Sequence, residues 1–285
     1  MSNAWQMARS SALYFAGRGL SGVVTMLLLP LYTTHIDTAA YGYYETASSV
    51  VIVLVPVLCL EVWTGMLKYT LARRAGACPY GEEEIYGAAF LLLACGSAVF
   101  VLGCTAVYLF HPFRCFGWVL ASGISLALCC GEGYVARCEQ KNATYAASGV
   151  LGAIASATAG IVGVYALKMQ AQALFAAYVA GNAAQILWLE SQNKLFLGRK
   201  LSFAGVDRAL LFSLVRFCAP LGLNAAVFYL MNNFNKVIIN AVLGESAVGI
   251  FSVVGKFMAV AATVAVAIEY AWAELTFSLG ERADK

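Results

Sequence analysis

The sequence has few charged residues, and this scarcity argues against an ordinary soluble protein. Asp, Glu, Lys and Arg make up 12% of the 285 residues, whereas 61% are hydrophobic. Soluble domains carry about 25% charged residues. Long apolar runs in such a composition are typical of a polytopic membrane protein. The net charge of +3 forms no basic patch, so the pattern indicates no nucleic-acid partner.

Motifs for metal binding and catalysis are also missing from the sequence. The only two histidines, His35 and His111, are isolated in predicted loops, and two isolated histidines do not make a zinc site. The nine cysteines form no C-x-x-C pair, so we expect them to be buried apolar residues. No Ser/His/Asp, H-E-x-x-H or P-loop pattern occurs. We therefore expect neither an enzyme, nor a cofactor, nor ATP-driven transport by this chain.

Eight stretches are long and apolar enough to cross a bilayer, which needs about 20 residues of helix. The predicted fold class is an all-α polytopic membrane protein, with about eight transmembrane helices over 12–34, 43–67, 86–110, 116–136, 145–166, 171–189, 210–235 and 247–275. The fifth stretch contains SGVLGAIASATAGIVG. Its small residues predict close packing between helices.

Basic residues indicate the orientation of these spans. Most of the 18 Lys and Arg residues fall on one side of the predicted spans, whereas Arg114, Lys168 and Lys236 fall on the other. By the positive-inside rule, we expect both termini in the cytoplasm and the HIDTAAYGYY loop outside the cell, with the chain in the inner (plasma) membrane.

A short motif occurs twice, 207 residues apart. DTAAYGYYETASSV (37–50) aligns with GESAVGIFSVVGKF (244–257), so that Gly42 matches Gly249 and Tyr44 matches Phe251. An even number of predicted spans separates the copies, which predicts two parallel lobes with a site between them. The expected domains are a six-helix lobe over 1–190, a cytoplasmic connector over 191–209, and the first two helices of an incomplete second lobe over 210–285.

A polar stripe marks the first predicted span as one wall of a substrate cavity. Tyr14, Arg18, Ser21, Thr25 and Tyr32 share one face of a helix at their spacing. A polar stripe is costly in lipid, and an arginine can hold a phosphate with two hydrogen bonds. The alternative is that Arg18 snorkels to the cytoplasmic surface.

Polar residues on the last two predicted spans are the other cavity candidates. Asn224 and Asn235 share a face of the seventh span, with Asn232 close by, and Lys256 lies in the eighth. Lys256 is the strongest candidate of this group, because an unpaired lysine in a membrane is expensive. Hydrogen bonding between helices is the alternative role for these residues.

Two carboxylates in predicted spans are candidates for coupling to a proton or another ion. Glu61 lies in the second span and Glu132 in the fourth. A buried carboxyl group can bind a proton. A salt bridge with a structural role is the alternative, and an interfacial position is a further one for Glu61.

Five segments together resemble one family of transporters. They are LLLPLYTTHIDTAAYGYYETAS, LKY (67–69), ARCEQKNATYAASGVLGAIAS (136–156), VRFCAPLGLNAAVFYLMNNFNKVIINAVLG (215–244) and AVGIFSVVGKF (247–257). This set is similar to the oligosaccharide-lipid flippases of polysaccharide biosynthesis. Their superfamily also holds the multidrug/toxin extruders and the lipid II flippases. The chain differs in carrying Asn235 where family members often have an acidic residue, and the family continues for at least four more spans.

The resemblance implies a function and a set of partners. The substrate would be an undecaprenyl-diphosphate-linked oligosaccharide, carried across the cytoplasmic membrane by alternating access for surface polysaccharide biosynthesis. An ion gradient or the membrane potential would drive it. Membrane lipids, a polysaccharide polymerase and other assembly proteins would be its partners. The alternatives are a multidrug/toxin extruder of the same superfamily, and a truncated remnant or assembly subunit that transports nothing.

Overall fold

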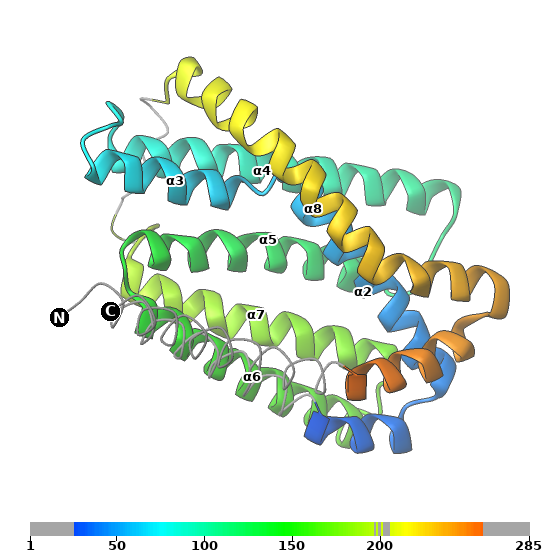
Figure 1. The fold of residues 1–285 in the computed structure, drawn as a ribbon. Helices are drawn as coiled ribbons and strands as arrows, with labels where there is room; N and C mark the ends of the chain where they lie inside the picture. Colours follow the sequence, from blue (N-terminus) through cyan, green and yellow to red (C-terminus); the bar gives the residue numbers. More distant parts are fainter. Residues whose placement is uncertain (1–25, 197, 199–200, 202–205, 259–285) are drawn as a thin grey trace, which may run out of the picture.

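The computed structural model describes residues 26–196, 198, 201 and 206–258, and these residues form α-helices and no strand, which confirms the all-α class. The helices with both ends described are α2 (Thr38–Leu58), α3 (Val62–Arg74), α4 (Glu82–Phe110), α5 (Phe116–Cys138), α6 (Asn142–Tyr165), α7 (Ala171–Asn193) and α8 (Arg208–Leu243). Residues 26–35 and 245–258 are also helical. In Figure 1, α5 lies between the α3–α4 pair and the α6–α7 pair, and α8 runs obliquely past them.

Five of the described helices are long and apolar enough to cross a membrane: α2, α4, α5, α6 and α8. The other predicted spans correspond to α7 and to the helical residues 26–35 and 245–258. The described part of the chain therefore has the helix lengths and apolar composition of an integral membrane protein.

Capping residues explain where the helices next to the site begin and end. Asp37 accepts hydrogen bonds from the backbone N–H groups of Ala39 (3.0 Å) and Ala40 (3.4 Å) at the start of α2. Asp207 accepts one in the same way at the start of α8. An acidic N-cap satisfies the free N–H groups of a first turn. Gly244, with φ of 84°, ends α8 in a conformation that favours glycine.

The second predicted span, 43–67, is wrong as a single helix. Helix α2 ends at Leu58, and α3 starts at Val62 in a new direction (Figure 1). Leu60 and Glu61 adopt left-handed backbone angles, at a cost of about 1–2 kcal/mol each for residues other than glycine. Close packing accompanies the break, because a Cβ on Gly96 of α4 would lie 2.6 Å from the Leu58 carbonyl oxygen.

Small residues bring α6 and α7 together, as the composition predicts. A Cβ on Gly163 would lie 2.9 Å from that of Ala173, and one on Gly181 would lie 3.0 Å from the carbonyl oxygen of Gly152. A larger side chain at these positions would force the helices apart. This packing between backbones is common in membrane helices, where lipid provides no hydrophobic drive for association.

The two copies of the repeated motif cross each other at their glycines. A Cβ on Gly42 of α2 would lie 1.8 Å from the carbonyl oxygen of Glu245, and one on Gly249 would lie 2.3 Å from the carbonyl oxygen of Thr38. The offset that aligns Gly42 with Gly249 also aligns Thr38 with Glu245, so the two contacts are equivalent. Such reciprocal contacts are the pattern that a local two-fold axis produces.

Candidate functional site

The described chain holds a charged cluster around a buried carboxylate where three helices meet. Glu45 of α2 accepts from Lys236 Nζ of α8 at 2.6 Å and pairs with Lys256 Nζ of the helix 245–258 at 3.1 Å. The Glu45 side chain is only 5% exposed, against 18% for Lys236 and 34% for Lys256. One carboxylate therefore ties together segments that lie far apart in the sequence.

The glycine crossing explains why these side chains meet. Glu45 lies one turn after Gly42, and Lys256 lies two turns after Gly249. Because the two backbones touch at the glycines, these side chains stay within reach of each other. Lys236 reaches the same carboxylate because α8 is 36 residues long and continues to Leu243.

Two sequence-based expectations about the lysines are wrong. Lys236, expected in an external loop, lies within α8. Lys256, expected to be an unpaired cation, is paired with Glu45. The length of α8 brings Lys236 to Glu45, and the crossing of α2 with the helix 245–258 brings Lys256 to it. The Glu45 carboxylate therefore pairs with both ammonium groups.

The cluster carries one more positive than negative charge. In the described residues Glu45 is the only carboxylate that forms an ion pair with either lysine. An excess charge is poorly solvated in apolar surroundings, where electrostatic interactions are strong. The arrangement can therefore attract an anion, and Lys256 is the more exposed of the two cations.

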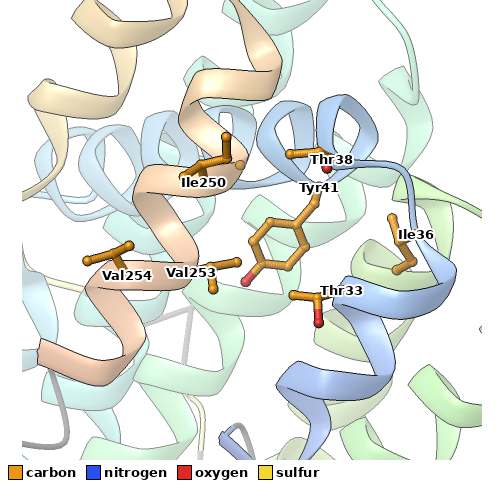
Figure 2. Close-up of a pocket in the computed structure, with 8 residues that line it drawn as sticks. Thr33, Ile36, Thr38, Tyr41, Ile250, Val253 and Val254 are labelled. Atoms are coloured by element: carbon orange, nitrogen blue, oxygen red, sulfur yellow. The ribbon is translucent and has the colours of Figure 1, made fainter.

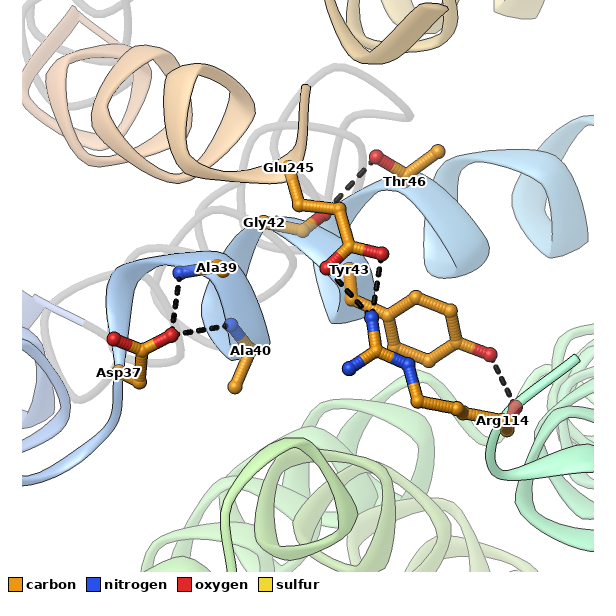
Figure 3. Close-up of polar contacts among 8 residues, drawn as sticks. All are labelled: Asp37, Ala39, Ala40, Gly42, Tyr43, Thr46, Arg114 and Glu245. Atoms are coloured by element: carbon orange, nitrogen blue, oxygen red, sulfur yellow. Dashed lines mark hydrogen bonds and ion pairs between the residues drawn. The ribbon is translucent and has the colours of Figure 1, made fainter.

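A second set of polar contacts lies beside the glycine crossing (Figure 3). Arg114, in the turn between α4 and α5, binds both carboxylate oxygens of Glu245 at 2.5 and 2.6 Å. Its guanidinium lies 4.6 Å from the ring centre of Tyr43, and the Tyr43 hydroxyl donates to the Arg114 carbonyl. The hydrogen bond to Glu245 raises the pKa of the Arg114 guanidinium above its usual value. The pair thus holds the start of the helix 245–258 against the α4–α5 turn.

A pocket of about 210 Å³ lies next to the charged cluster. Its walls come from the helix 26–35, the start of α2 and the helix 245–258, with Tyr41 between them (Figure 2). Most lining residues are apolar, including Ile36, Ile250 and Val253. Tyr41 precedes Glu45 by one helical turn, and its hydroxyl faces that carboxylate. Tyr41 therefore borders the pocket on one side and the Glu45 carboxylate on the other.

The three asparagines predicted to line the cavity make none of the ion pairs of this cluster. Asn224, Asn232 and Asn235 are all exposed on α8, and the Asn232 amide donates to the Phe228 carbonyl of its own helix at 2.7 Å. The predicted residues of the first span lie outside the described residues: Tyr14, Arg18, Ser21 and Thr25.

The two predicted coupling carboxylates have different environments. Glu61 is partly buried at the break between α2 and α3, where it is the N-cap residue of α3 without a capping hydrogen bond from its side chain. Glu132 is completely buried in α5 and accepts from Asn193 Nδ2 at 3.2 Å. Only Glu132 is therefore enclosed by protein.

Sequence reasoning missed the central residue of the cluster, Glu45. The sequence did contain a signal. Glu45 lies in a predicted span, and two lysines without an evident partner, Lys236 and Lys256, lie in or beside later predicted spans. Its pairing could not be assigned without the helix crossing. No protein-family model, curated protein or solved structure matches the chain.

Proposed function

We propose that this protein is a flippase that moves a lipid-linked oligosaccharide, carried on undecaprenyl diphosphate, across the inner membrane. The observation that carries the proposal is the pairing of one buried carboxylate, Glu45, with two partly exposed ammonium groups, Lys236 and Lys256, which leaves an excess of positive charge among these three groups. A diphosphate is the anionic group of such a substrate, and lysine ammonium groups bind phosphate as point charges. An extruder of cationic drugs would instead favour an acidic site.

The architecture that we propose around this site has eight spans, with both termini in the cytoplasm. A six-helix lobe over 1–190 and the first helices of a second lobe over 210–285 would face each other across the glycine crossing. The reciprocal contacts of Gly42 and Gly249 support this arrangement. Alternating access would then be a movement of the two lobes about their contact.

Within this mechanism, Lys236 and Lys256 would receive the diphosphate as it displaces Glu45. Arg18, Tyr14, Ser21 and Thr25 would form the facing wall, and Asn224, Asn232 and Asn235 would contact sugar hydroxyls. Glu61 and Glu132 are the candidates for ion or proton coupling. The lipid tail would stay in the bilayer, beside the apolar pocket at Ile250 and Val253.

Complementation of a flippase-deficient strain tests the proposal. The wild-type chain should restore surface polysaccharide, and Lys236→Gln and Lys256→Gln should each reduce it at least about tenfold. Each variant removes one of the two ammonium groups that would bind the diphosphate, and about 1.4 kcal/mol of lost affinity is a factor of ten. Lys168→Gln is the matched control, because Lys168 is exposed in the turn after α6. Membrane levels of each variant are compared by immunoblot.

The possible results separate the proposal from its rivals. Equal restoration by all three variants would contradict a role for the lysines. Failure of the wild-type chain, at a normal membrane level, would favour a remnant or an assembly subunit. Resistance to cationic drugs without restored polysaccharide would favour the extruder.

A further inference from the structure

The contact between α5 and α7 contains a buried polar pair that lacks a hydrogen-bond donor. Asn193 Nδ2 donates to Glu132 Oε2 and to the Glu132 carbonyl, both at 3.2 Å. Within the described residues, the second oxygen of each side chain, Glu132 Oε1 and Asn193 Oδ1, is buried without a partner. Buried polar atoms nearly always have one. Two unsatisfied acceptors in a single contact therefore point to a missing hydrogen.

The surroundings of Glu132 disfavour a negative charge. The described charged groups that act on it most strongly are acidic: Glu190 of α7 and Glu139 just after α5. Glu190 accepts from the backbone N–H groups of Leu195 (3.1 Å) and Phe196 (3.0 Å), which stabilises its ionised form. Glu139 is already paired with a lysine. A carboxylate at Glu132 would thus be buried among acidic neighbours, which is costly.

We propose that Glu132 and Asn193 form a proton-binding site, in which Glu132 Oε1 carries the proton. The resulting O–H group is the donor that the pair lacks, and Asn193 Oδ1 is an acceptor for it. A protonated Glu132 and Asn193 can then join α5 to the end of α7 by two hydrogen bonds. When the proton leaves to water, one bond is lost and two carboxylates, Glu132 and Glu190, face each other.

The biological purpose of this proton site rests on the coupling role proposed above. It selects Glu132 over Glu61, because the Glu61 side chain is partly exposed to solvent. Proton binding itself is independent of any substrate. Its tests therefore use the purified full chain and no transport assay, so that either proposal can fail alone.

Infrared difference spectroscopy in H₂O and D₂O tests for the proton directly. Near neutral pH the wild-type chain should show the carbonyl band of a protonated carboxylic acid, and Glu132→Gln should lose it. Glu83→Gln, at an exposed position of α4, should keep it. Asn193→Ala should shift the band without removing it, since the acid loses its partner. A wild-type spectrum without the band, or a band that persists in Glu132→Gln, would overturn the proposal.

Thermal unfolding as a function of pH is the second measurement. The folded wild type would bind a proton that the unfolded chain releases above its ordinary glutamate pKa, so stability should fall as pH rises. Glutamine keeps the shape and cannot ionise. Between about pH 6 and about pH 9, the wild type should lose about 3 °C or more relative to Glu132→Gln. Parallel curves for the two proteins would overturn the proposal.

Discussion

Replacing Glu45 with glutamine tests the charged cluster most directly. The substitution keeps the size of the side chain but removes the carboxylate that lies 2.6 Å from Lys236 and 3.1 Å from Lys256, which is their only ion-pair partner among the described residues. Removing one partner of a buried ion pair costs about 3–5 kcal/mol. Because Lys256 is one-third exposed, water offsets part of this cost, and we expect a loss of about 3 kcal/mol.

The cysteines of the chain provide an assay for this loss. Cys59, Cys138 and Cys218 are free and buried, so a thiol-reactive dye reports their exposure as the protein unfolds on heating. A change of 1 kcal/mol moves the melting temperature by about 2–4 °C in a chain of roughly this size. Glu45→Gln should therefore melt about 6–12 °C below the wild type. Glu83→Gln, an exposed substitution of the same kind, should change little.

A rescue variant separates lost charge compensation from a general packing defect. Adding Lys236→Met and Lys256→Met to Glu45→Gln removes all three charges of the cluster, and it should restore most of the lost stability. Two results would refute the reasoning. One is a Glu45→Gln protein that melts with the Glu83→Gln control; the other is a triple variant less stable than Glu45→Gln alone.

Two further predictions use the same thermal assay. Gly42→Ala should lower stability by about 2 kcal/mol or more, since its methyl group would overlap the Glu245 carbonyl. The control Gly103→Ala, at an open position of α4, should raise stability by about 0.5–1 kcal/mol. Stability changes of the same sign in the two variants would contradict the glycine crossing. Arg114→Gln should lower stability by under about 1 kcal/mol, because the Arg114 side chain is 64% exposed. The difference in stability from the wild type should shrink in high salt. A large loss of stability that salt does not change would contradict a solvent-exposed Arg114–Glu245 pair.

The helices were largely predictable because local composition determines them. Apolar runs gave the ranges of α4, α5 and α6 to within a few residues, and the Gly and Ala content correctly indicated close packing of α6. The break at 59–61 could not be predicted, because apolar residues continue through it. Its left-handed Leu60 and Glu61 accompany close backbone packing against Gly96 on another helix, which local sequence does not encode.

The candidate site was only partly predictable, because its contacts are long-range. Lys256 was a candidate since a lysine in an apolar run is conspicuous, but its partner Glu45 lies far away in the sequence. The same holds for Lys236, which is 191 residues from Glu45. For the asparagines of α8, helical spacing predicted that Asn224 and Asn235 share one face. Spacing alone did not specify what that face contacts.

The glycine crossing and the charged cluster are mechanically linked. The crossing fixes α2 against the helix 245–258 at Gly42 and Gly249. Along the helix 245–258, Glu245, which pairs with Arg114, comes before Gly249, and Lys256, which pairs with Glu45, comes after it. A movement that separates these helices must therefore break a buried ion pair as well as a solvent-exposed one. An anion that binds Lys236 and Lys256 would lower the cost of breaking the buried pair, because it replaces the charge of Glu45. Ligand binding and helix separation would then favour each other, which is the coupling that the proposed transport requires.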